Sequence, residues 1–327
     1  MEFKELKNIP YSFTNIYPIK EHYDFYKRWV KEGYHGEMKY MEKIKERESL
    51  DNIFREAKSC MVIGIPYYIE IPQKEYRISR YAIFYDYHLW IKERLKEILK
   101  KYNVYGKIYI DTGPILERSF AQKAGLGFIG KNTNLISFKK GSYFFLAEII
   151  LPFEIRKLVN GENENFCGKC KKCIEACPTG ALKENFLLDA RKCISYLTIE
   201  YKGIIEEELI KKIGNNIFGC DICQEVCPWN KNPLKYDENF LKPNYEILNF
   251  SLEDFLRLKE EDFKKIFKNT PFKRIGYINF LRNCIICAGN TDFDKYKKIL
   301  KEFLKNNNEI LQIHTSFIFK NKTSPSL

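Results

Sequence analysis

The sequence predicts an α/β domain, then a small cysteine-rich domain and then an all-helical segment, along 327 residues. Three observations lead to this prediction. Before residue 158, short apolar runs of strand length alternate with amphipathic segments of helical spacing. Eight of the eleven cysteines fall between Cys167 and Cys227. Beyond about residue 235 the apolar residues recur at helical spacing. The predicted domain boundaries are 1–158, 159–235 and 236–327.

The first domain begins with helices and continues into a strand. Residues 1–59 are predicted to be helical, with two segments at 22–32 and 37–48 that a Gly-Tyr-His-Gly stretch separates. Residues 60–66 form an apolar run that ends in proline, which indicates a buried strand with Cys60 as a core residue. Residues 81–102 carry apolar side chains at helical spacing and predict a long amphipathic helix.

A second strand is predicted at 107–110, and Asp111-Thr-Gly-Pro then ends it. Pro114 suits the first turn of a helix that reaches Ala124. Residues 135–138 and 143–151, joined through 139–142, are predicted to form a β-hairpin. Asp111 is a candidate ligand-binding or catalytic residue, because ligand crevices of open α/β sheets lie at the carboxyl ends of strands. An ordinary turn aspartate that bonds backbone N–H groups is the alternative.

The segment Gly125-Leu-Gly-Phe-Ile-Gly130 matches the glycine pattern of dinucleotide-binding sites. Those sites need a strand before the glycines and a helix after them. Here a helix precedes and a hairpin follows, so no nicotinamide site is expected. The glycines still allow a flat ligand to approach the backbone closely, with Lys131 and Asn132 placed to hydrogen-bond it. His35 and His88 are isolated in the sequence and are interpreted as structural or surface residues.

The cysteine-rich stretch contains two related runs. The first has the C-x2-C-x2-C-x3-C-P spacing of two-cluster ferredoxins and consists of Cys167, Cys170, Cys173, Cys177 and Pro178. The second repeats that spacing without its first cysteine, which Ile217 replaces, and consists of Cys220, Cys223, Cys227 and Pro228. In such runs the fourth cysteine ligates the other cluster.

This rule assigns four thiolates to each of two [4Fe–4S] clusters in a ferredoxin-like domain. The first cluster takes Cys167, Cys170, Cys173 and Cys227. The second takes Cys177, Cys220, Cys223 and, as the only other cysteine between the runs, Cys193. Structural zinc also uses paired C-x2-C loops, but the spacing to proline and the total of eight cysteines favour clusters.

The remaining segments are a linker and helices. Residues 160–165 are polar and predict a linker into the cysteine-rich domain. Residues 272–288 and 294–304 predict two amphipathic helices split by Gly289-Asn290, and a further apolar helix reaches about Phe319. Paired helices of this kind are typical of α-solenoids. Cys284 and Cys287 share an apolar helical face and are interpreted as core residues.

Composition narrows the class of protein. The formal net charge of +12 suggests an anionic partner such as nucleic acid, although two clusters would remove roughly four of these charges. Lysine is common on surfaces, so charge alone leaves the partner open. Eleven cysteines in so long a chain do not indicate a disulfide scaffold. With neither a signal-peptide pattern nor an apolar run of bilayer length, a cytoplasmic protein without a membrane partner is expected.

Together these motifs resemble the epoxyqueuosine reductases, a family of cobalamin-dependent iron–sulfur enzymes that act on tRNA. The resemblance is carried by the eight cysteines and by Asp111–Arg118, Ala124–Thr133, Gly141-Ser142, Cys193–Glu200, Tyr81-Ala82 and Asp86-Tyr87-His88. One departure is Phe128, where the family usually has tryptophan, another flat aromatic residue. The C-terminal segment resembles a short form of the HEAT-like module found in part of the family.

The resemblance implies a base-off cobalamin between the first two domains, with two [4Fe–4S] clusters that relay electrons from an external donor of flavodoxin or ferredoxin type. The substrate would be epoxyqueuosine at the wobble position of a tRNA anticodon stem-loop, and the product queuosine. Asp111 matches the family's proton donor, and its pKa would have to be raised by burial. The expected corrin contacts are Arg47, Lys131, Asn132, Ser142, Ser195 and Asp221.

Two other functions compete with this one. A cobalamin-dependent reductase of small molecules, related to the reductive dehalogenases, is disfavoured by the missing twin-arginine pattern and by the positive charge. A plain two-cluster electron carrier would need no α/β domain with Asp111 and a glycine-rich loop. The sequence therefore favours the tRNA-modifying reductase.

Overall fold

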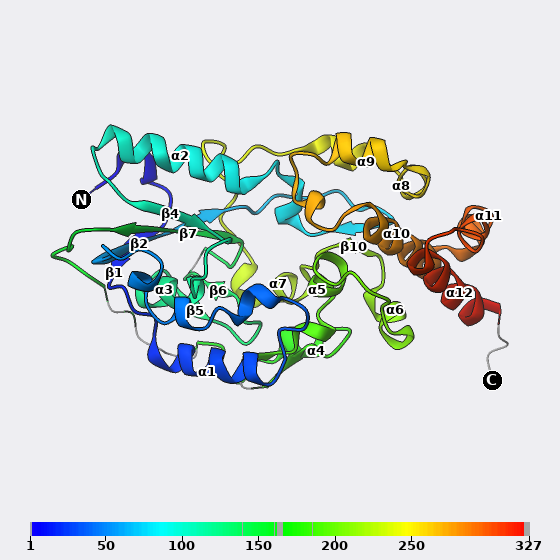
Figure 1. Cartoon of the computed structure of the whole chain (residues 1–327), viewed down its shortest axis with the longest axis horizontal. Helices are drawn as coiled ribbons and strands as arrows, with labels where there is room; N and C mark the ends of the chain where they lie inside the picture. Colours follow the sequence, from blue (N-terminus) through cyan, green and yellow to red (C-terminus); the bar gives the residue numbers. More distant parts are fainter. Residues whose placement is uncertain (1, 139, 160, 162–165, 185, 324–327) are drawn as a thin grey trace.

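The computed structural model describes the chain except for residues 1, 139, 160, 162–165, 185 and 324–327. The molecule is elongated, with a β-sheet near the N-terminus and packed helices at the C-terminal end (Figure 1). Most of the predicted linker 160–165 lies outside the described residues. Among the described helices, none is long and apolar enough to cross a membrane.

The sheet has four strands in the order β1–β2–β7–β4 and is antiparallel throughout. The strands are β1 (Tyr11–Thr14), β2 (Ser59–Pro66), β7 (Phe144–Leu151) and β4 (Lys107–Ile110). β2 and β7 pair along their full length, from Ser59 opposite Leu151 to Pro66 opposite Phe144. Both are buried along almost all of their length, which explains their nearly continuous apolar sequences.

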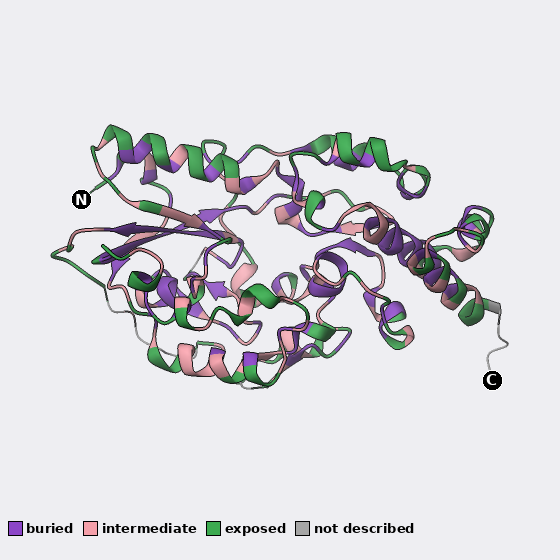
Figure 2. Cartoon of the chain, viewed as in Figure 1, coloured by how far each residue is buried: buried purple, intermediate pink, exposed green. Residues whose placement is uncertain are grey.

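Helices cover both faces of this sheet. α2 (Tyr87–Lys101) buries Ile91 and Leu95 in a core that includes Ile63 and Ala147. α3 (Glu117–Lys123) packs against the opposite face, in a second core that contains Val62 and Ile150. Figure 2 shows the central strands in the buried colour and the outer sides of α1 (Lys20–Lys31) and α2 exposed.

The strands predicted at 60–66 and 107–110 and the helix predicted at 22–32 are confirmed. The helix predicted at 37–48 is wrong, because this stretch forms only the short 3-10 turns η2 (Lys39–Glu42) and η3 (Lys45–Arg47). These turns bury a single side chain and so offer no apolar face to pack. The edge strand β1 was missed. α2 begins later than predicted, because Asp86 caps it by accepting the N–H of His88.

The predicted hairpin of 135–138 with 143–151 is also wrong. β6 (Leu135–Ile136) instead pairs with β5 (Phe128–Ile129), and only Ser137 and Gly141 bridge across the expected connection. Gly127 makes this pairing possible, since a Cβ there would lie 2.1 Å from the carbonyl oxygen of Ile136. The glycine-rich segment therefore allows two backbone segments to pack closely against each other.

The cysteine-rich part is built from short elements. They are α4 (Lys172–Glu175), β8 (Leu182–Lys183), β9 (Leu187–Leu188), η6 (Ala190–Lys192), α5 (Ile194–Ile199), α6 (Glu207–Ile213), β10 (Asn216–Phe218), α7 (Ile222–Glu225) and η7 (Pro228–Asn230). β10 pairs in parallel with β3 (Arg77–Ile78) of the N-terminal part. The two parts therefore share backbone hydrogen bonds.

The C-terminal part is helical, as predicted. After η8 (Tyr245–Asn249) it contains α8 (Leu252–Arg257), α9 (Glu260–Ile266), η9 (Pro271–Arg274), α10 (Tyr277–Thr291), α11 (Phe293–Phe303) and α12 (Glu309–Thr323). α10 runs through Gly289, where a break was expected, because the missing side chain there makes room for Ile318 of α12. Cys284 and Cys287 are fully buried, which confirms them as core residues. The main apolar core is continuous across all three parts of the chain.

The close approach at Gly127 gives a stability prediction. Gly127→Ala should lower the free energy of unfolding by about 2 kcal/mol or more, because a backbone carbonyl cannot move aside as a side chain does. Gly64→Ala is the matched control, since its new Cβ would meet only side-chain atoms at 3.4 Å or more. Thermal unfolding of both variants checks the difference; equal losses would contradict it.

Candidate active site

Asp111 directly follows β4 and has an unusual backbone conformation. Its φ of +56° lies in the left-handed region, which aspartate tolerates better than most residues. The backbone N–H of Asp111 donates to Oε1 of Glu117 at 2.7 Å, so the first turn of α3 holds this conformation. The Asp111 side chain is 54% exposed and therefore accessible to a ligand. Strained backbone of this kind is typical of functional positions.

The first turn of α2 supplies the partners of the Asp111 carboxylate. The Tyr87 hydroxyl donates to Oδ2 at 2.7 Å, and Nε2 of His88 lies 3.5 Å from the same oxygen. Nδ1 of His88 is 2.8 Å from Oδ1 of Asp86. The interpretation of His88 as an isolated residue is therefore wrong. His88 contacts Asp111, which is distant in sequence. The only sequence signal for this contact was the Asp86-Tyr87-His88 stretch at the start of α2.

These contacts set the protonation of the site. Burial alone would raise the pKa of Asp111, but the nearby His88 imidazole, the hydrogen bond from Tyr87 and the charge of Arg274 bring it below its ordinary value. Burial disfavours the charged form of His88, yet its proximity to the carboxylates of Asp111 and Asp86 raises its pKa to about 9. At neutral pH the structure holds an ionised Asp111 beside a protonated His88. From the sequence, we expected burial to raise the pKa of Asp111, as a proton donor requires. In the structure, the pKa of Asp111 is lowered instead.

Glu117 is a second group that sequence reasoning did not single out. Burial, and then the negative charge of Asp111, raise the pKa of Glu117 to about 8. Glu117 therefore carries a proton at neutral pH while it accepts the backbone N–H of Asp111.

The helical part also reaches this site. Arg274 in η9 pairs through Nε with Oε1 of Glu200 at 2.7 Å, and its guanidinium lies 5.4 Å from the ring centroid of Tyr40. Its positive charge is among those that lower the pKa of Asp111. Burial, and then the charge of Glu200, raise the pKa of Tyr40 to about 12. Residues from all three parts of the chain therefore influence the charges of this site.

Four of the six expected corrin contacts, Lys131, Asn132, Ser142 and Asp221, make hydrogen bonds between the α/β part and the cysteine-rich part. Nζ of Lys131 donates to the carbonyls of Gly168 and Cys170, at 2.7 and 3.0 Å. Nδ2 of Asn132 donates to the carbonyl of Cys223 at 3.3 Å. These two side chains join the two parts of the protein.

Ser142 and Asp221 are also engaged with protein groups. The Ser142 hydroxyl donates to Oε1 of Gln224 at 2.9 Å, and Asp221 accepts the backbone N–H of Arg80 at 2.8 Å. Ser195 lies in the first turn of α5, two residues after Cys193.

Arg47 lies apart from these four and is 5% exposed. One terminal nitrogen donates to the carbonyls of Tyr40 and Lys43, at 3.1 and 3.2 Å. Its buried Nε has no hydrogen-bond partner among the described residues. A buried donor of this kind is costly unless a further group accepts from it.

The eight cysteines of the central stretch fall into two electrostatic groups. Burial raises the pKa of Cys173, and Cys167 and Cys227 raise it further. Burial likewise raises the pKa of Cys227, with smaller effects from Cys167 and Cys170. These are the four residues assigned to the first cluster.

The other four cysteines interact in the same way. Burial raises the pKa of Cys220 to about 12, with contributions from Cys193 and Cys177. Burial, and then Cys193 and Cys220, raise the pKa of Cys223 well above its usual value, with a smaller effect from Cys173 of the first group. Free thiols here would stay protonated at neutral pH, whereas a bound metal would deprotonate them. In the described residues, no three histidine, cysteine, aspartate or glutamate side chains are grouped around a position for a single metal ion.

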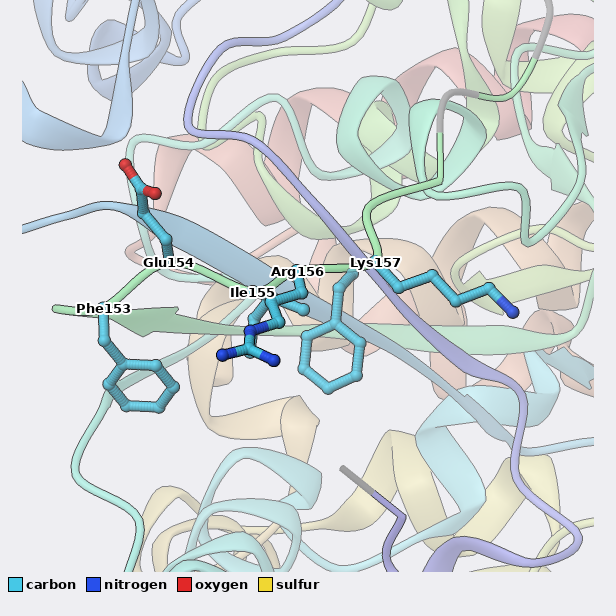
Figure 3. A pocket seen from close by; sticks show the side chains of 6 residues that line it. Phe153, Glu154, Ile155, Arg156 and Lys157 are labelled. Carbon is cyan, nitrogen blue, oxygen red and sulfur yellow. The ribbon is translucent and has the colours of Figure 1, made fainter.

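A separate hollow lies away from this site. It is lined by Phe13 and by the segment 153–157, with Arg156 and Lys157 among its side chains (Figure 3). Ile110, just before Asp111, pairs with Ala147, whereas the hollow begins beyond Leu151 at the other end of β7. It is therefore not part of the site around Asp111.

Comparison with known proteins adds two family matches. The model of the 4Fe-4S double cluster binding domain matches residues 166–230, which contain all eight cysteines. This confirms the iron–sulfur prediction and excludes the zinc alternative. The model of epoxyqueuosine reductase QueG matches residues 47–112, which end next to Asp111.

Whole-chain comparisons agree with these matches. The chain is 37% identical to the epoxyqueuosine reductase of Pseudomonas aeruginosa over 295 residues, covering 83% of this chain and 79% of that protein. It is 35% identical to that of Escherichia coli K12, over 88% of this chain and 79% of the relative. A crystal structure of epoxyqueuosine reductase with an epoxyqueuosine-modified tRNA-Tyr stem loop superposes with a TM-score of 0.84 and 29% identity, covering 97% of this chain and 87% of that chain.

The charge pair predicts how His88 titrates. His88 should titrate with a pKa of about 9, and in Asp111→Asn this pKa should fall by roughly one unit or more. His314 is an internal control, because burial lowers its pKa to about 4 and it lies in the helical part. Proton NMR of the imidazole rings measures both; an unchanged His88 in the variant would contradict the pairing.

Proposed function

Because the chain belongs to the epoxyqueuosine reductase family, it is an oxidoreductase that reduces epoxyqueuosine to queuosine, and we propose which residues take part. The observation that carries the proposal is the accessible Asp111 carboxylate, hydrogen-bonded by Tyr87 and paired with a protonated His88. It lies where the α/β, cysteine-rich and helical parts meet. This arrangement provides a proton beside a ligand-accessible position, which the removal of an epoxide oxygen requires.

The ferredoxin-like part holds two [4Fe–4S] clusters and passes electrons inward. The first is ligated by Cys167, Cys170, Cys173 and Cys227, and the second by Cys177, Cys193, Cys220 and Cys223. The two electrostatic groups of thiols support these assignments. Four soft thiolates for each cluster is the donor set that iron–sulfur cubanes need.

An external one-electron donor of flavodoxin or ferredoxin type reduces the first cluster. Phe166, next to Cys167, and Trp229, two residues after Cys227, form an aromatic cluster with Phe138. Phe138 and Phe166 are 43% and 42% exposed, so this cluster offers an apolar surface to a docking carrier. Cys193 and Cys220 of the second cluster pack against the main core instead.

Cobalamin, held base-off between the α/β and ferredoxin-like parts, supplies a strongly reducing cobalt ion when bound. The buried Nε of Arg47 supports such a ligand, because it needs an acceptor that the described residues do not provide. Lys131, Asn132, Ser142 and Asp221 make contacts between these two parts, and Ser195 lies two residues after Cys193. These side chains would exchange some of their protein partners for the corrin periphery.

Asp111 delivers a proton to the departing epoxide oxygen. Its carboxylate is ionised in the structure, so it must first receive a proton from a neighbour that holds one at neutral pH. His88, 3.5 Å from Oδ2, meets this requirement with its pKa of about 9. Tyr87 orients the carboxylate through the hydroxyl that donates to the same oxygen.

The tRNA anticodon stem-loop is the macromolecular substrate, and the reaction takes place in the cytoplasm, where tRNA is found. The net charge of +12 suits contacts with its phosphates. A wobble base splayed out of the loop would reach Asp111, as single-stranded RNA bases do in protein sites. The C-terminal helices form a short HEAT-like module that contributes Arg274 to the rim of the site.

The activity itself gives the first test of this function. The chain, reconstituted anaerobically with iron, sulfide and cobalamin, should convert epoxyqueuosine in tRNA to queuosine when supplied with a low-potential reductant. Mass analysis of the digested nucleosides detects the loss of one oxygen. Asp111→Asn should keep about eight irons and its cobalamin but lose about 100-fold or more in turnover.

Asp51→Asn is the matched control for this variant, because Asp51 is exposed and distant in sequence from the site. It should keep full activity. Full turnover in Asp111→Asn would remove the proton-donor role, and no conversion by the wild-type chain would overturn the function.

The ligand sets give another prediction. Cys193→Ala should lower the iron content from about eight to about four per chain, because only the second cluster loses a thiolate. Cys60→Ala, which removes a buried cysteine outside both sets, should keep all eight. Iron analysis with electron paramagnetic resonance of the reduced protein checks both variants; a full iron content in Cys193→Ala would contradict the assignment.

A further inference from the structure

Helix α10 contains an arginine that is completely buried and has no acidic partner. Arg282 is 0% exposed. Among the described residues, its guanidinium donates only to uncharged oxygens, namely the carbonyls of Leu197, Tyr201 and Gly203 and Oδ1 of Asn283. Burying a charge without an opposite charge nearby is costly. A negative group bound close to α10 would offset that cost.

The carbonyls that Arg282 binds follow Cys193 in the chain. Cys193 directly precedes α5, and one terminal nitrogen of Arg282 donates to the carbonyl of Leu197, in the last turn of this helix, at 2.7 Å. The other terminal nitrogen donates to the carbonyls of Tyr201 and Gly203, just beyond the helix, at 3.0 and 2.8 Å. The guanidinium therefore lies at the C-terminal end of α5, where helix carbonyls favour a cation.

The next residue of α10 reaches the segment that leads to Cys220. Nδ2 of Asn283 donates to the carbonyl of Thr198 in α5 and to that of Ile217 in β10, at 2.9 Å in both cases. β10 ends two residues before Cys220. α10 accordingly packs against α5 and β10 (Figure 1). It holds the backbone next to Cys193 and next to Cys220, two residues assigned to the second cluster.

The segments that link Arg282 to these cysteines are buried. Ile194 and Leu197 of α5 and Ile217 of β10 are at most 3% exposed. Because an α-helix rises about 1.5 Å per residue, the guanidinium lies on the order of 10 Å from Cys193. Solvent does not screen a charge in such surroundings, so it acts on its neighbours over this distance.

The acidic groups next to the second cluster set are already paired with arginines. Asp221, within the second cysteine run, lies 3.1 Å from Arg80. Arg80 also pairs with Glu225 at 2.7 Å, and Glu225 pairs with Arg77. Two carboxylates and two guanidinium groups therefore largely cancel each other. Arg282 is left as a buried positive charge that no acidic side chain offsets.

We propose that Arg282 is the countercharge of the second iron–sulfur cluster and raises its reduction potential. A [4Fe–4S] cluster with four thiolates carries about two negative charges when oxidised and about three when reduced. The positive charge of Arg282 therefore favours the reduced form. One electron leaves the first cluster, which the external donor reduces, and enters the second, with no bond formed or broken. This inference rests on the proposed ligand sets and extends the proposed function.

Arg282→Gln tests the proposal, because the amide can still donate to a carbonyl while the charge is lost. The full chain, reconstituted anaerobically with iron and sulfide, is titrated with reductant and followed by electron paramagnetic resonance. The wild type should show two one-electron midpoint potentials, and Cys193→Ala should show only that of the first cluster. In Arg282→Gln the equilibrium constant for reduction of the second cluster should fall about tenfold, which corresponds to about 59 mV. The first midpoint should change much less.

Two further variants separate charge from packing. Arg282→Lys keeps a positive charge and should hold the second midpoint within about twofold of the wild-type equilibrium constant. Lys202→Gln is the matched control, because Nζ of Lys202 donates to the carbonyl of Ile199 at the same end of α5, at 2.9 Å. Lys202 is exposed, so solvent screens its charge and both midpoints should stay unchanged. An unchanged second midpoint in Arg282→Gln, or an equal fall in Arg282→Lys, would overturn the proposal.

Iron analysis decides the outcome if a variant does not assemble both clusters. Loss of the second cluster from Arg282→Gln, with its retention in Arg282→Lys, would support the proposal, because both side chains donate hydrogen bonds and only lysine is charged. Loss from both variants would overturn it, because the bonding geometry of arginine would then be the cause. These measurements need neither cobalamin nor tRNA, so failure of the inference can be told from failure of the reductase function.

Discussion

The pairing of Asp111 with His88 joins the two elements on which the site depends. Asp111 ends β4, and His88 lies in the first turn of α2, which Asp86 caps. A carboxylate beside an imidazolium is stabilised in its ionised form. A solitary aspartic acid is already ionised at neutral pH. In the proposed reaction, Asp111 would donate the proton and His88 would store it, so a group of low pKa could act as an acid.

The second constraint is the seam between the α/β and cysteine-rich parts. β3 and β10 share backbone hydrogen bonds across it, and Lys131 donates to carbonyls of the first cysteine loop. The backbone N–H of Lys131 also lies 3.4 Å from Sγ of Cys167. Hydrogen bonds to cluster sulfurs tune the reduction potential of iron–sulfur centres. If Cys167 ligates the first cluster as proposed, the glycine-rich segment would influence the potential of that cluster.

Sequence reasoning could predict whatever depends on local spacing. The cysteine spacing predicted the double iron–sulfur domain that the family match supports, and the apolar run at 60–66 predicted β2. Sequence reasoning failed where the structure depends on contacts between distant segments. Leu135 pairs with Ile129 instead of with β7, because Gly127 has no side chain and lets the two backbone segments approach closely. The pattern of apolar residues does not indicate such a contact.

The same limit explains the active-site residues that were missed. The roles of His88, Glu117 and Arg274 arise from neighbours that are distant in sequence or that belong to another part of the chain. The low pKa of Asp111 follows from those neighbours, whereas burial alone would have raised it. Candidate residues could be located from motifs, but their protonation could not.

The continuous core has a consequence for how the protein matures. Apolar side chains from the sheet, the cysteine-rich part and the helical part share the main interior, whereas only the smaller core under α3 belongs to the α/β part alone. Two thiols of the proposed second cluster set, Cys193 and Cys220, pack against the main interior. With these ligands, cluster assembly would couple to folding of that shared interior. A shortage of iron or sulfide would then reduce the amount of folded protein.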